Sequence, residues 1–326
     1  MLYIDNRWRG HHGIARFSSQ VIPRISSTHQ KIGGAKPLGL RALLGGLAIG
    51  RNSRVYTPGF NATLTRAPQL LTIHDLIHLQ LTDETSKAKG LYYEKVVKPS
   101  ILRSGVVHTV SDYSKSQIEA WLGSRNVSVI NVGNGVSDVF FRDAHASLEP
   151  GRASGPRFVY VGNLKSHKNA SVIFAALRLR PDYSVDFVSS NRDEVIKQAS
   201  AYGVEVQVGL ISAISDSELA GLYEESAGLL FPSKMEGFGL PPLEALMAGS
   251  SVAYSSECAA VAEVVGQAGY AVDDAGSPVD WARAMDDLIG RMPVLTPAFR
   301  DNLRRKYSWS SVGERVQESL REWIDS

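Results

Sequence analysis

The sequence has a single cysteine, Cys258, among its 326 residues. One thiol cannot form an internal disulfide or a zinc cage, so the composition argues against a secreted, disulfide-stabilised scaffold and favours a reducing, cytoplasmic compartment. Long hydrophobic runs are also lacking. The longest, residues 38–50, contains Arg41 and four glycines and falls short of the roughly 20 residues that cross a bilayer. The first ten residues lack the charged start and apolar core of a signal peptide, so we expect no export.

The remaining composition, 44% hydrophobic and 21% charged, is that of a globular protein rather than a disordered or fibrous one. At about 150 residues per domain, the length predicts two domains. Residues 1–74 carry ten basic side chains and one acid, a net charge of +9, so the rest of the chain carries −7 of the overall +2. Because these basic residues are spread among apolar ones, we expect an anionic lipid surface or a phosphorylated ligand rather than nucleic acid.

Short apolar runs alternate with amphipathic stretches, which is typical of strands and helices in a mostly parallel sheet. Strands are expected at residues 70–76, 105–111, 127–133, 158–163, 185–190, 204–209, 227–233 and 251–255. Residues 141–157, rich in small residues and proline, indicate a linker, and residues 307–324 show the spacing of an amphipathic helix. Ligands of open α/β sheets bind at the carboxyl ends of strands, so we expect the chemistry there.

The most informative segment is FPSKMEGFGLPPLEALMAGS, residues 231–250. A predicted strand ends in a glycine-bearing loop that holds Glu236, and two prolines open a helix that carries Glu244 in its first turn. The backbone amides of residues 238–240 and the positive helix end form a site for oxygen-rich or anionic groups. A lone glutamate is usually a solvated side chain, but two glutamates in this setting can bind two sets of hydroxyls.

This string resembles the signature of the retaining glycosyltransferases of family 4, which have the GT-B fold and a Glu-x7-Glu motif at this place. Other segments match in the family's order: GIARF (13–17), TIHDLIHL (72–79), TVSDYSKSQI (109–118), NGV (134–136) and YVGNLKSHKN (160–169). The resemblance implies an α/β protein with two Rossmann-like, doubly wound domains that face a central cleft. We expect an acceptor domain at residues 1–150, with a terminal helix at 308–326 packed back on it, and a donor domain at residues 151–307.

The resemblance also implies roles for residues of the donor domain. Glu236 matches the glutamate near the donor sugar hydroxyls, and Glu244 matches the one that binds the nucleotide ribose. Lys168 matches the lysine that neutralises the donor diphosphate, which departs with negative charge. The other expected donor-binding residues of this domain are Gly162, Asn163, Gly237, Phe238, Gly239 and Leu240. The chain has no Asp-x-Asp motif, so we expect neither a metal ion nor another cofactor.

Two positions depart from the family pattern. The family often has a basic residue where this chain has Asn163, so the second positive charge has three candidates: Lys165, His167 and Arg16. Gly13 is an expected donor-binding residue between a strand and a helix, where its lack of a side chain lets a phosphate or an acceptor approach the backbone. The family commonly has Gly-Ile-Gly here. This chain has Ala15 in place of the second glycine, which we expect to narrow the space for the acceptor.

The candidate catalytic residues are His74, Lys168 and Glu236. His74 ends a predicted strand and matches a histidine that points at the donor sugar, where it hydrogen-bonds a hydroxyl or shapes charge at the reacting centre. Asp75 either orients the His74 ring or caps the following segment. With Arg16, Asp75 is the candidate for binding the acceptor.

The resemblance implies a hexosyltransferase that moves a sugar from a nucleotide diphosphate to a glycan or lipid-linked hydroxyl, with retained configuration. The HDLI and HKN context resembles bacterial mannosyltransferases of exopolysaccharide and O-antigen synthesis, which favours GDP-mannose over a UDP-sugar. Two other classes stay open: a nucleotide-sugar epimerase of the same fold and a non-catalytic glycan-binding partner. Residues 31–54, apolar with basic flanks, form either a buried helix or a segment that contacts an anionic membrane at its inner face.

Overall fold

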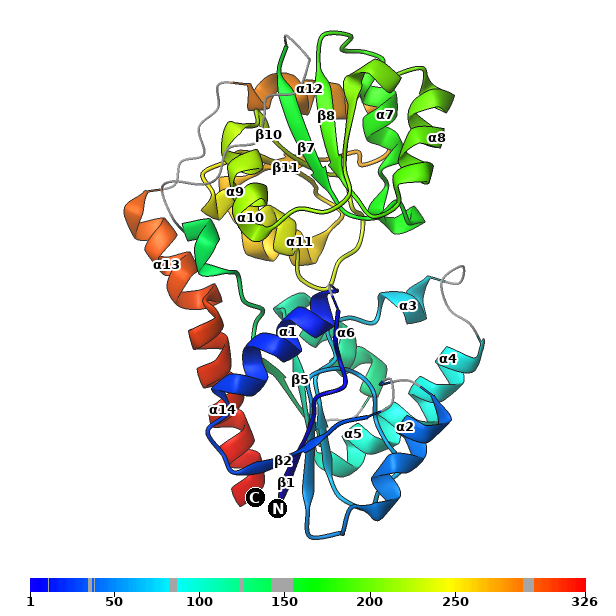
Figure 1. Ribbon diagram of the computed structural model, residues 1–326, viewed down its shortest axis with the longest axis vertical. Coiled ribbons are helices and arrows are strands. Elements are labelled where there is room, and N and C mark those ends of the chain that lie inside the picture. Colours follow the sequence, from blue (N-terminus) through cyan, green and yellow to red (C-terminus); the bar gives the residue numbers. More distant parts are fainter. Residues whose placement is uncertain are drawn as a thin grey trace. The chain divides into compact units, whose positions relative to one another are not determined.

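The computed structural model describes residues 1–10, 12–34, 37, 39–81, 87–123, 126–141, 155–289 and 296–326. Most of the predicted linker, residues 142–154, lies outside these ranges. The chain divides into two compact units (Figure 1). Unit 1 comprises residues 1–135 and 305–326, and unit 2 comprises residues 136–304. Within the described ranges, no helix is both long and apolar enough to span a membrane.

Unit 1 is built on parallel strands. Four of them form a sheet in the order β2-β1-β3-β4, and an isolated bridge between Thr72 and His108 joins it to the pair β5-β6. The strands are β1 (Leu2–Asp5), β2 (His29–Ile32), β3 (Arg54–Thr57), β4 (Gln69–Leu71), β5 (Val106–Thr109) and β6 (Ser128–Asn131). The chain winds outward in opposite directions from β1 and β3, and the carboxyl ends at such a switch point are where ligands bind in doubly wound sheets.

Helices cover both faces of the unit 1 sheet. Alternate residues of a strand face opposite sides, and in β5 the side chain of Val107 joins the apolar cluster under α5 and α6. Its neighbour His108 lies on the other face, with Nε2 2.8 Å from the hydroxyl of Ser319 in α14. The helices are α1 (Gly13–Val21), α2 (Leu40–Leu44), α3 (Ile77–Gln80), α4 (Lys87–Tyr92), α5 (Lys98–Ser104), α6 (Asp112–Leu122) and α14 (Trp309–Asp325). The C-terminal helix α14 packs on α1, where Trp309 contacts Phe17.

Unit 2 has a single six-stranded parallel sheet in the order β12-β11-β10-β7-β8-β9. Its strands are β7 (Arg157–Val161), β8 (Ser184–Val188), β9 (Val208–Ile211), β10 (Gly228–Phe231), β11 (Val252–Ser255) and β12 (Tyr270–Val272). The winding direction changes between β7 and β10, which pair with each other. The switch point of unit 2 therefore lies between the loops that leave these two strands.

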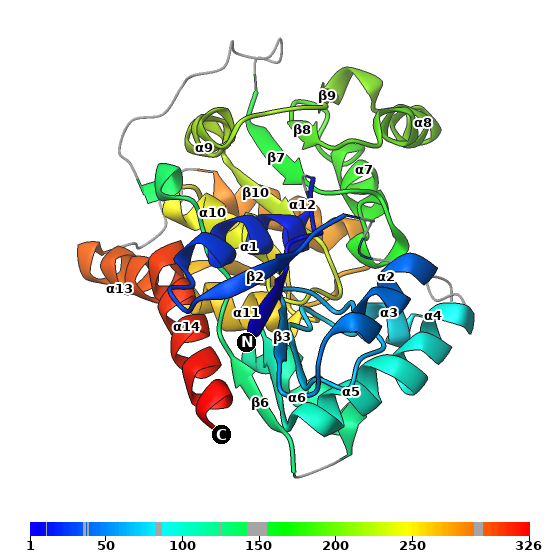
Figure 2. The same cartoon turned by 60° about the horizontal axis from the view of Figure 1, so that its bottom comes forward.

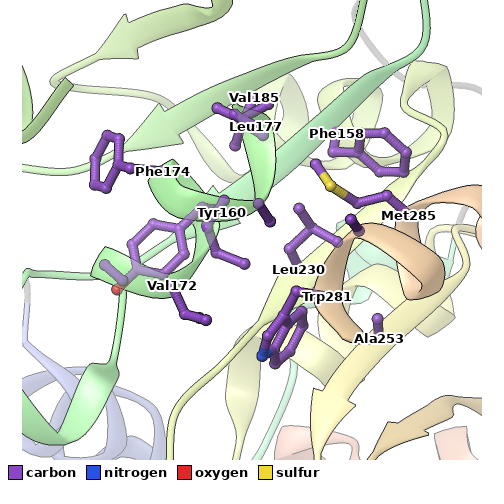
Figure 3. Close-up of a cluster of buried hydrophobic side chains, with 14 of the residues drawn as sticks. Phe158, Tyr160, Val172, Phe174, Leu177, Val185, Leu230, Ala253, Trp281 and Met285 are labelled. Carbon is purple, nitrogen blue, oxygen red and sulfur yellow. The ribbon is translucent and has the colours of Figure 1, made fainter. Parts of the chain in front are cut away.

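The core of unit 2 lies between the sheet and three helices, α7 (Ser171–Leu177), α8 (Arg192–Tyr202) and α12 (Pro278–Leu288). Phe158 and Leu230 from the strands meet Trp281 and Met285 of α12 there (Figure 3). Helix α8 lies beside α7 in both views (Figure 1 and Figure 2). The alternate residues of these strands, such as Leu229, point to the opposite face of the sheet and are also buried. Helices α9 (Asp216–Glu225), α10 (Leu240–Met247) and α11 (Ala259–Val265) cover that face. Burial on both faces explains why these strands read as continuous apolar runs.

The predicted strand at residues 204–209 is confirmed only at residues 208–209 and is wrong before them. Residues Glu205–Gln207 form a 3-10 turn, and β9 begins only at Val208. The side chain of Gln207 explains the difference, because its buried amide donates to the carbonyls of Leu177, Arg180 and Tyr183, at 3.2, 2.8 and 2.9 Å. This side chain closes the end of α7 instead of following the alternation of a strand.

Residues 31–54 do not form the single buried helix that was one of the two expectations. They contain the end of β2, the short helix α2, a 3-10 turn at Gly45–Ala48 and the start of β3. Two glycines directly after α2 end it, since glycine has low helix propensity. Leu44 and Leu47 in this region are 42% and 66% exposed.

A buried ion pair lies where β1 ends. Asp5 has no exposed surface; its Oδ1 accepts from Nε of Arg7 at 2.8 Å and its Oδ2 from the Asn61 amide at 2.6 Å. Asn61 follows β3, so this network ties together the two loops at the switch point of unit 1.

We predict that Asp5→Ala lowers the free energy of unfolding by about 3–5 kcal/mol, because it leaves the guanidinium of Arg7 buried without its carboxylate. Lys197→Ala is the control: Lys197 pairs with Glu194 at 3.7 Å, but its side chain is 78% exposed, and such pairs contribute about 1 kcal/mol or less. Urea denaturation of the full chain measures both values. Equal stability of the two variants would show that the Asp5 network does not hold the switch point.

Candidate functional site

The centre of the candidate site is an ion pair at the switch point of unit 2. Lys168 lies on the loop that leaves β7 and Glu236 on the loop that leaves β10. The Nζ of Lys168 donates to Oε1 of Glu236 at 2.6 Å, and the side chains are 19% and 13% exposed. Nζ also lies 5.9 Å from the centre of the Phe231 ring, on whose face a cation is attracted. A cation and a carboxylate are thus held together where an α/β sheet binds ligands.

Backbone geometry fixes the position of Lys168. It ends a 3-10 turn, Ser166–Lys168, and the next residue, Asn169, has a φ of 54°. Asparagine tolerates this left-handed conformation better than most residues. Its side-chain amide donates to the carbonyl of Ala275 at 2.7 Å. The carbonyl of His167 accepts from the backbone N–H of Lys234 at 2.9 Å, which ties this turn to the loop after β10.

The first glycine-bearing loop begins with Gly162 and Asn163. The carbonyl of Asn163 accepts from the Tyr160 hydroxyl at 2.7 Å, and its Oδ1 accepts from the backbone N–H of Lys165 at 3.2 Å. A Cβ at Gly162 would lie 3.4 Å from the Tyr160 hydroxyl. Asn163 therefore shapes the turn before Lys168. Which residue supplies the second positive charge for the donor diphosphate, Lys165, His167 or Arg16, stays a prediction. Lys165 is exposed.

The second loop leads into α10, as predicted, with prolines in the first turn. Gly239 precedes the helix with a φ of 104°, and a Cβ there would lie 2.8 Å from Cγ2 of Val261. Only glycine fits this backbone without strain or collision. Glu244 and Phe238 are buried, and Glu244 lies in α10. Because prolines have no N–H, the donors at this helix start are the amides of residues 237–240 and not those of residues 241–242.

The structure adds two residues that the sequence did not single out as part of the site. Burial, reinforced by the charge of Glu236, raises the pKa of the Cys258 thiol to about 12, so the thiol is protonated at neutral pH. Burial and the charge of Glu236 also raise the pKa of Tyr160. Both groups therefore stay neutral beside the ion pair. Cys258 is distant in sequence and follows another strand, β11, so only the fold brings it near Glu236.

In unit 1, His74 is held as a neutral ring. Burial lowers its pKa to about 4, against the opposing effect of a hydrogen bond to the Pro58 carbonyl, and the charge of His12 lowers it further. The bond joins Nε2 to the carbonyl oxygen at 3.1 Å. Because a carbonyl only accepts, Nε2 carries the proton and Nδ1 carries the lone pair. The Phe17 ring of α1 packs edge-on against the imidazole, with centroids 5.0 Å apart.

The other predicted residues of unit 1 are arranged around α1 and the segment after β4. Gly13 is the first residue of α1, and a Cβ there would meet nothing within 4 Å. Arg16 lies one turn further along the same helix. Asp75 accepts from the backbone N–H of Ile77 at 3.1 Å, so it caps α3, one of its two predicted roles. The predicted site residues thus form one set in unit 2, and His74, Asp75, Gly13 and Arg16 form another in unit 1.

Residues 149–296 match the family described as Glycosyl transferases group 1. The GDP-mannose:cellobiosyl-diphosphopolyprenol alpha-mannosyltransferase of Komagataeibacter xylinus is 32% identical over 197 residues, which are 56% of this chain and 48% of the relative. The O-antigen chain mannosyltransferase RfbU of Salmonella typhimurium is 27% identical over 250 residues, which are 72% of this chain and 67% of that relative. Residues 149–296 of this chain are thus similar to the group 1 glycosyltransferases. The chain spans about half the length of the first of these relatives.

The matched region contains both Lys168 and Glu236. The solved structure of Anabaena Alr3699/HepE in complex with UDP-glucose is similar, with a TM-score of 0.73 and 14% identity, over 98% of this chain and 99% of that one. At this identity the likeness shows the fold, which is GT-B. The fold class predicted from the sequence is therefore confirmed, and the predicted family is matched over residues 149–296. The roles of individual site residues stay predictions.

We predict that Gly239→Ala destabilises the protein more than Gly249→Ala. Both glycines have positive φ, 104° and 84°, so both changes strain the backbone, by about 1–2 kcal/mol. A Cβ at Gly249 meets no atom within 4 Å, whereas a Cβ at Gly239 collides with Val261. Urea denaturation of the two variants isolates the collision as the difference between them. Equal losses would mean that the loop moves away from α11 without cost.

We also predict that unit 1 loses stability in acid. Burial lowers the pKa of His74 to about 4 and that of His108 to about 3. Between pH 6.5 and pH 4 the unfolded chain takes up protons that the folded chain refuses, so the free energy of unfolding falls as the pH falls. His74→Gln should flatten this dependence, because it removes one of the two buried rings that take up a proton only on unfolding. Thermal midpoints of the full chain from pH 7 to pH 4 test this, and identical pH profiles for His74→Gln and the unmodified chain would contradict it.

Proposed function

We propose that this chain transfers mannose from GDP-mannose to a hydroxyl of a lipid-linked glycan, with retained anomeric configuration and without a metal ion. The observation that carries the proposal is the ion pair of Lys168 and Glu236 at the switch point of unit 2. It offers a cation for a diphosphate and a carboxylate for sugar hydroxyls side by side. The two mannosyltransferase relatives support mannose, and the GDP-mannose donor and diphosphopolyprenol acceptor that the first is named for support a GDP-linked donor and a lipid diphosphate acceptor.

In this proposal the donor separates the ion pair. Lys168 turns to the donor diphosphate and stabilises the negative charge that develops on the leaving phosphate oxygen. Glu236 then accepts hydrogen bonds from hydroxyls of the mannose. The backbone amides of residues 237–240 bind the sugar, and the buried carboxylate of Glu244 accepts from the ribose hydroxyls.

The transfer itself breaks the bond between the anomeric carbon and the diphosphate oxygen and forms a bond to the acceptor oxygen on the same face. The proton of the acceptor hydroxyl passes to the departing phosphate oxygen, so no protein nucleophile is needed. His74 contributes as a neutral ring: Nε2–H is fixed on Pro58, and Nδ1 accepts a hydrogen bond from a sugar hydroxyl. Arg16 and Asp75 lie on the acceptor side.

Incubation of the purified chain with GDP-mannose and a lipid-diphosphate glycan acceptor, with EDTA present, tests the proposal. We expect release of GDP and a product with the α configuration, measured by proton NMR. UDP-glucose in place of GDP-mannose tests the alternative donor. Turnover of the donor without acceptor would indicate an epimerase instead, and the absence of nucleotide binding would indicate a non-catalytic partner.

We predict that Lys168→Ala lowers kcat by about 10²–10³, because it removes the charge that stabilises the leaving group. Lys234→Ala is the matched control: this lysine lies two residues before Glu236, but its Nζ pairs with the exposed Glu257, at 3.9 Å. We expect kcat of the control to stay unchanged. Full activity of Lys168→Ala would remove the lysine from the mechanism.

A further inference from the structure

Unit 1 contains an apolar pocket of about 440 Å³. Its walls come from three separate segments: α2 contributes Leu43, the loop after β3 contributes Phe60 and Ala62, and α4 contributes Ala88, Lys89 and Tyr92. The lining is apolar or aromatic apart from one charged residue, Lys89. Most small-molecule sites have this character, with apolar walls and few polar groups.

The loop after β3, which forms one wall of the pocket, is held by hydrogen bonds, so this wall is preformed. The Tyr92 hydroxyl donates to the carbonyl of Ala62 at 2.8 Å, and the buried amide of Gln69 donates to the carbonyl of Thr63 at 2.7 Å. At the start of the loop, Asn61 is bonded to the buried carboxylate of Asp5. A preformed wall costs a ligand little ordering on binding.

Three exposed leucines lie on the elements that line the pocket or directly after one of them. Leu44 in α2, Leu47 in the 3-10 turn that follows it and Leu91 in α4 are 42%, 66% and 60% exposed. A single exposed leucine is ordinary, but three on the elements of an apolar pocket favour an apolar ligand or surface.

Among the described residues that line the pocket, the charged one is Lys89. Its Nζ lies 5.5 Å from the centre of the Phe60 ring, over an apolar wall. The segment that supplies two of the three walls, residues 1–74, carries +9. An apolar cavity with a cation at its wall fits a ligand that joins a hydrocarbon chain to an anionic group.

The pocket adjoins the residues expected to bind the acceptor. The Phe60 ring contacts the ring of His78, with centroids 6.1 Å apart, and Nδ1 of His78 lies 3.9 Å from the carboxylate of Asp75. Two residues before Phe60, the carbonyl of Pro58 holds His74. The loop after β3 thus has one part in the pocket wall and another against the candidate catalytic histidine.

We propose that this pocket binds the hydrocarbon chain of the acceptor lipid and that Lys89 pairs with the phosphate next to that chain. The proposal rests on the proposed function, in that it assigns a site in unit 1 to the lipid phosphate of the acceptor proposed there. The exposed leucines meet the part of the chain that continues beyond the pocket. The bound lipid therefore brings the glycan toward Asp75 and His74.

Calorimetric titration of the full chain with farnesyl diphosphate tests the proposal, with inorganic diphosphate as the ligand that lacks a chain. We expect farnesyl diphosphate to bind and inorganic diphosphate to bind at least about tenfold more weakly, a difference of about 1.4 kcal/mol. Ala88→Trp fills the pocket from an exposed helix position and should weaken farnesyl diphosphate by about tenfold or more. Ala120→Trp, on exposed surface of α6, is the matched control and should leave binding unchanged.

Lys89→Gln should weaken farnesyl diphosphate several-fold, and Lys95→Gln, an exposed lysine in the next helical turn, should not. GDP-mannose is titrated in parallel against every variant. If GDP-mannose binds but farnesyl diphosphate does not, or if Ala88→Trp binds it as well as the control, the pocket proposal is wrong and the proposed function stands. If GDP-mannose itself fails to bind the unmodified chain, the proposed function is wrong instead.

Discussion

The ion pair between Lys168 and Glu236 links two loops that are 68 residues apart in sequence. It exists because β7 and β10 are neighbours where the winding of the unit 2 sheet changes direction. Removal of either partner of such a partly buried ion pair destabilises the protein, because the other charge is left without a counter-ion. The surrounding residues hold both loops in place. Asn169 and His167 fix the turn that carries Lys168, and Gly239 lets the loop that carries Glu236 approach α11. In our account, a nucleotide-sugar is the ligand that satisfies both charges at once.

Unit 1 uses its switch point differently. The carboxylate there, Asp5, is fully buried and already paired with Arg7 and Asn61, so it holds loops rather than a ligand. Those loops in turn present Pro58 to His74 and Phe60 to the apolar pocket. A switch point of a parallel sheet therefore gives a charged site in unit 2 and a rigid frame beside an apolar pocket in unit 1.

The sequence predicted the parts of the site that lie in short, continuous motifs. Seven residues of loop and helix separate Glu236 from Glu244, and Lys168 follows a strand that is apolar enough to recognise. Most central strands were predicted for the same reason, because burial on both faces leaves an apolar run. The strand β2, HQKI, was missed because its middle residues are exposed and polar.

Features made by contact between distant segments could not be predicted in this way. Cys258 lies near Glu236 only because β11 follows β10 in the sheet, and Gln207 interrupts an apparent strand to bond carbonyls near the end of α7. The apolar pocket needs three segments that share no motif. The sequence left two roles open for Asp75. The hydrogen bond from the backbone N–H of Ile77 to its carboxylate, which supports the capping role, depends on where α3 begins.

Calorimetry of GDP and GDP-mannose binding to Glu236→Gln and Lys168→Gln tests most directly whether the donor separates the ion pair of Lys168 and Glu236. If the donor divides the ion pair, Lys168→Gln weakens both ligands, because both carry the diphosphate. Glu236→Gln then leaves GDP bound as well as before, or better, since the lysine is released, while GDP-mannose loses the contribution of its sugar. Equal weakening of GDP and GDP-mannose by Glu236→Gln would contradict the account, because the carboxylate would then act on the nucleotide and not on the sugar.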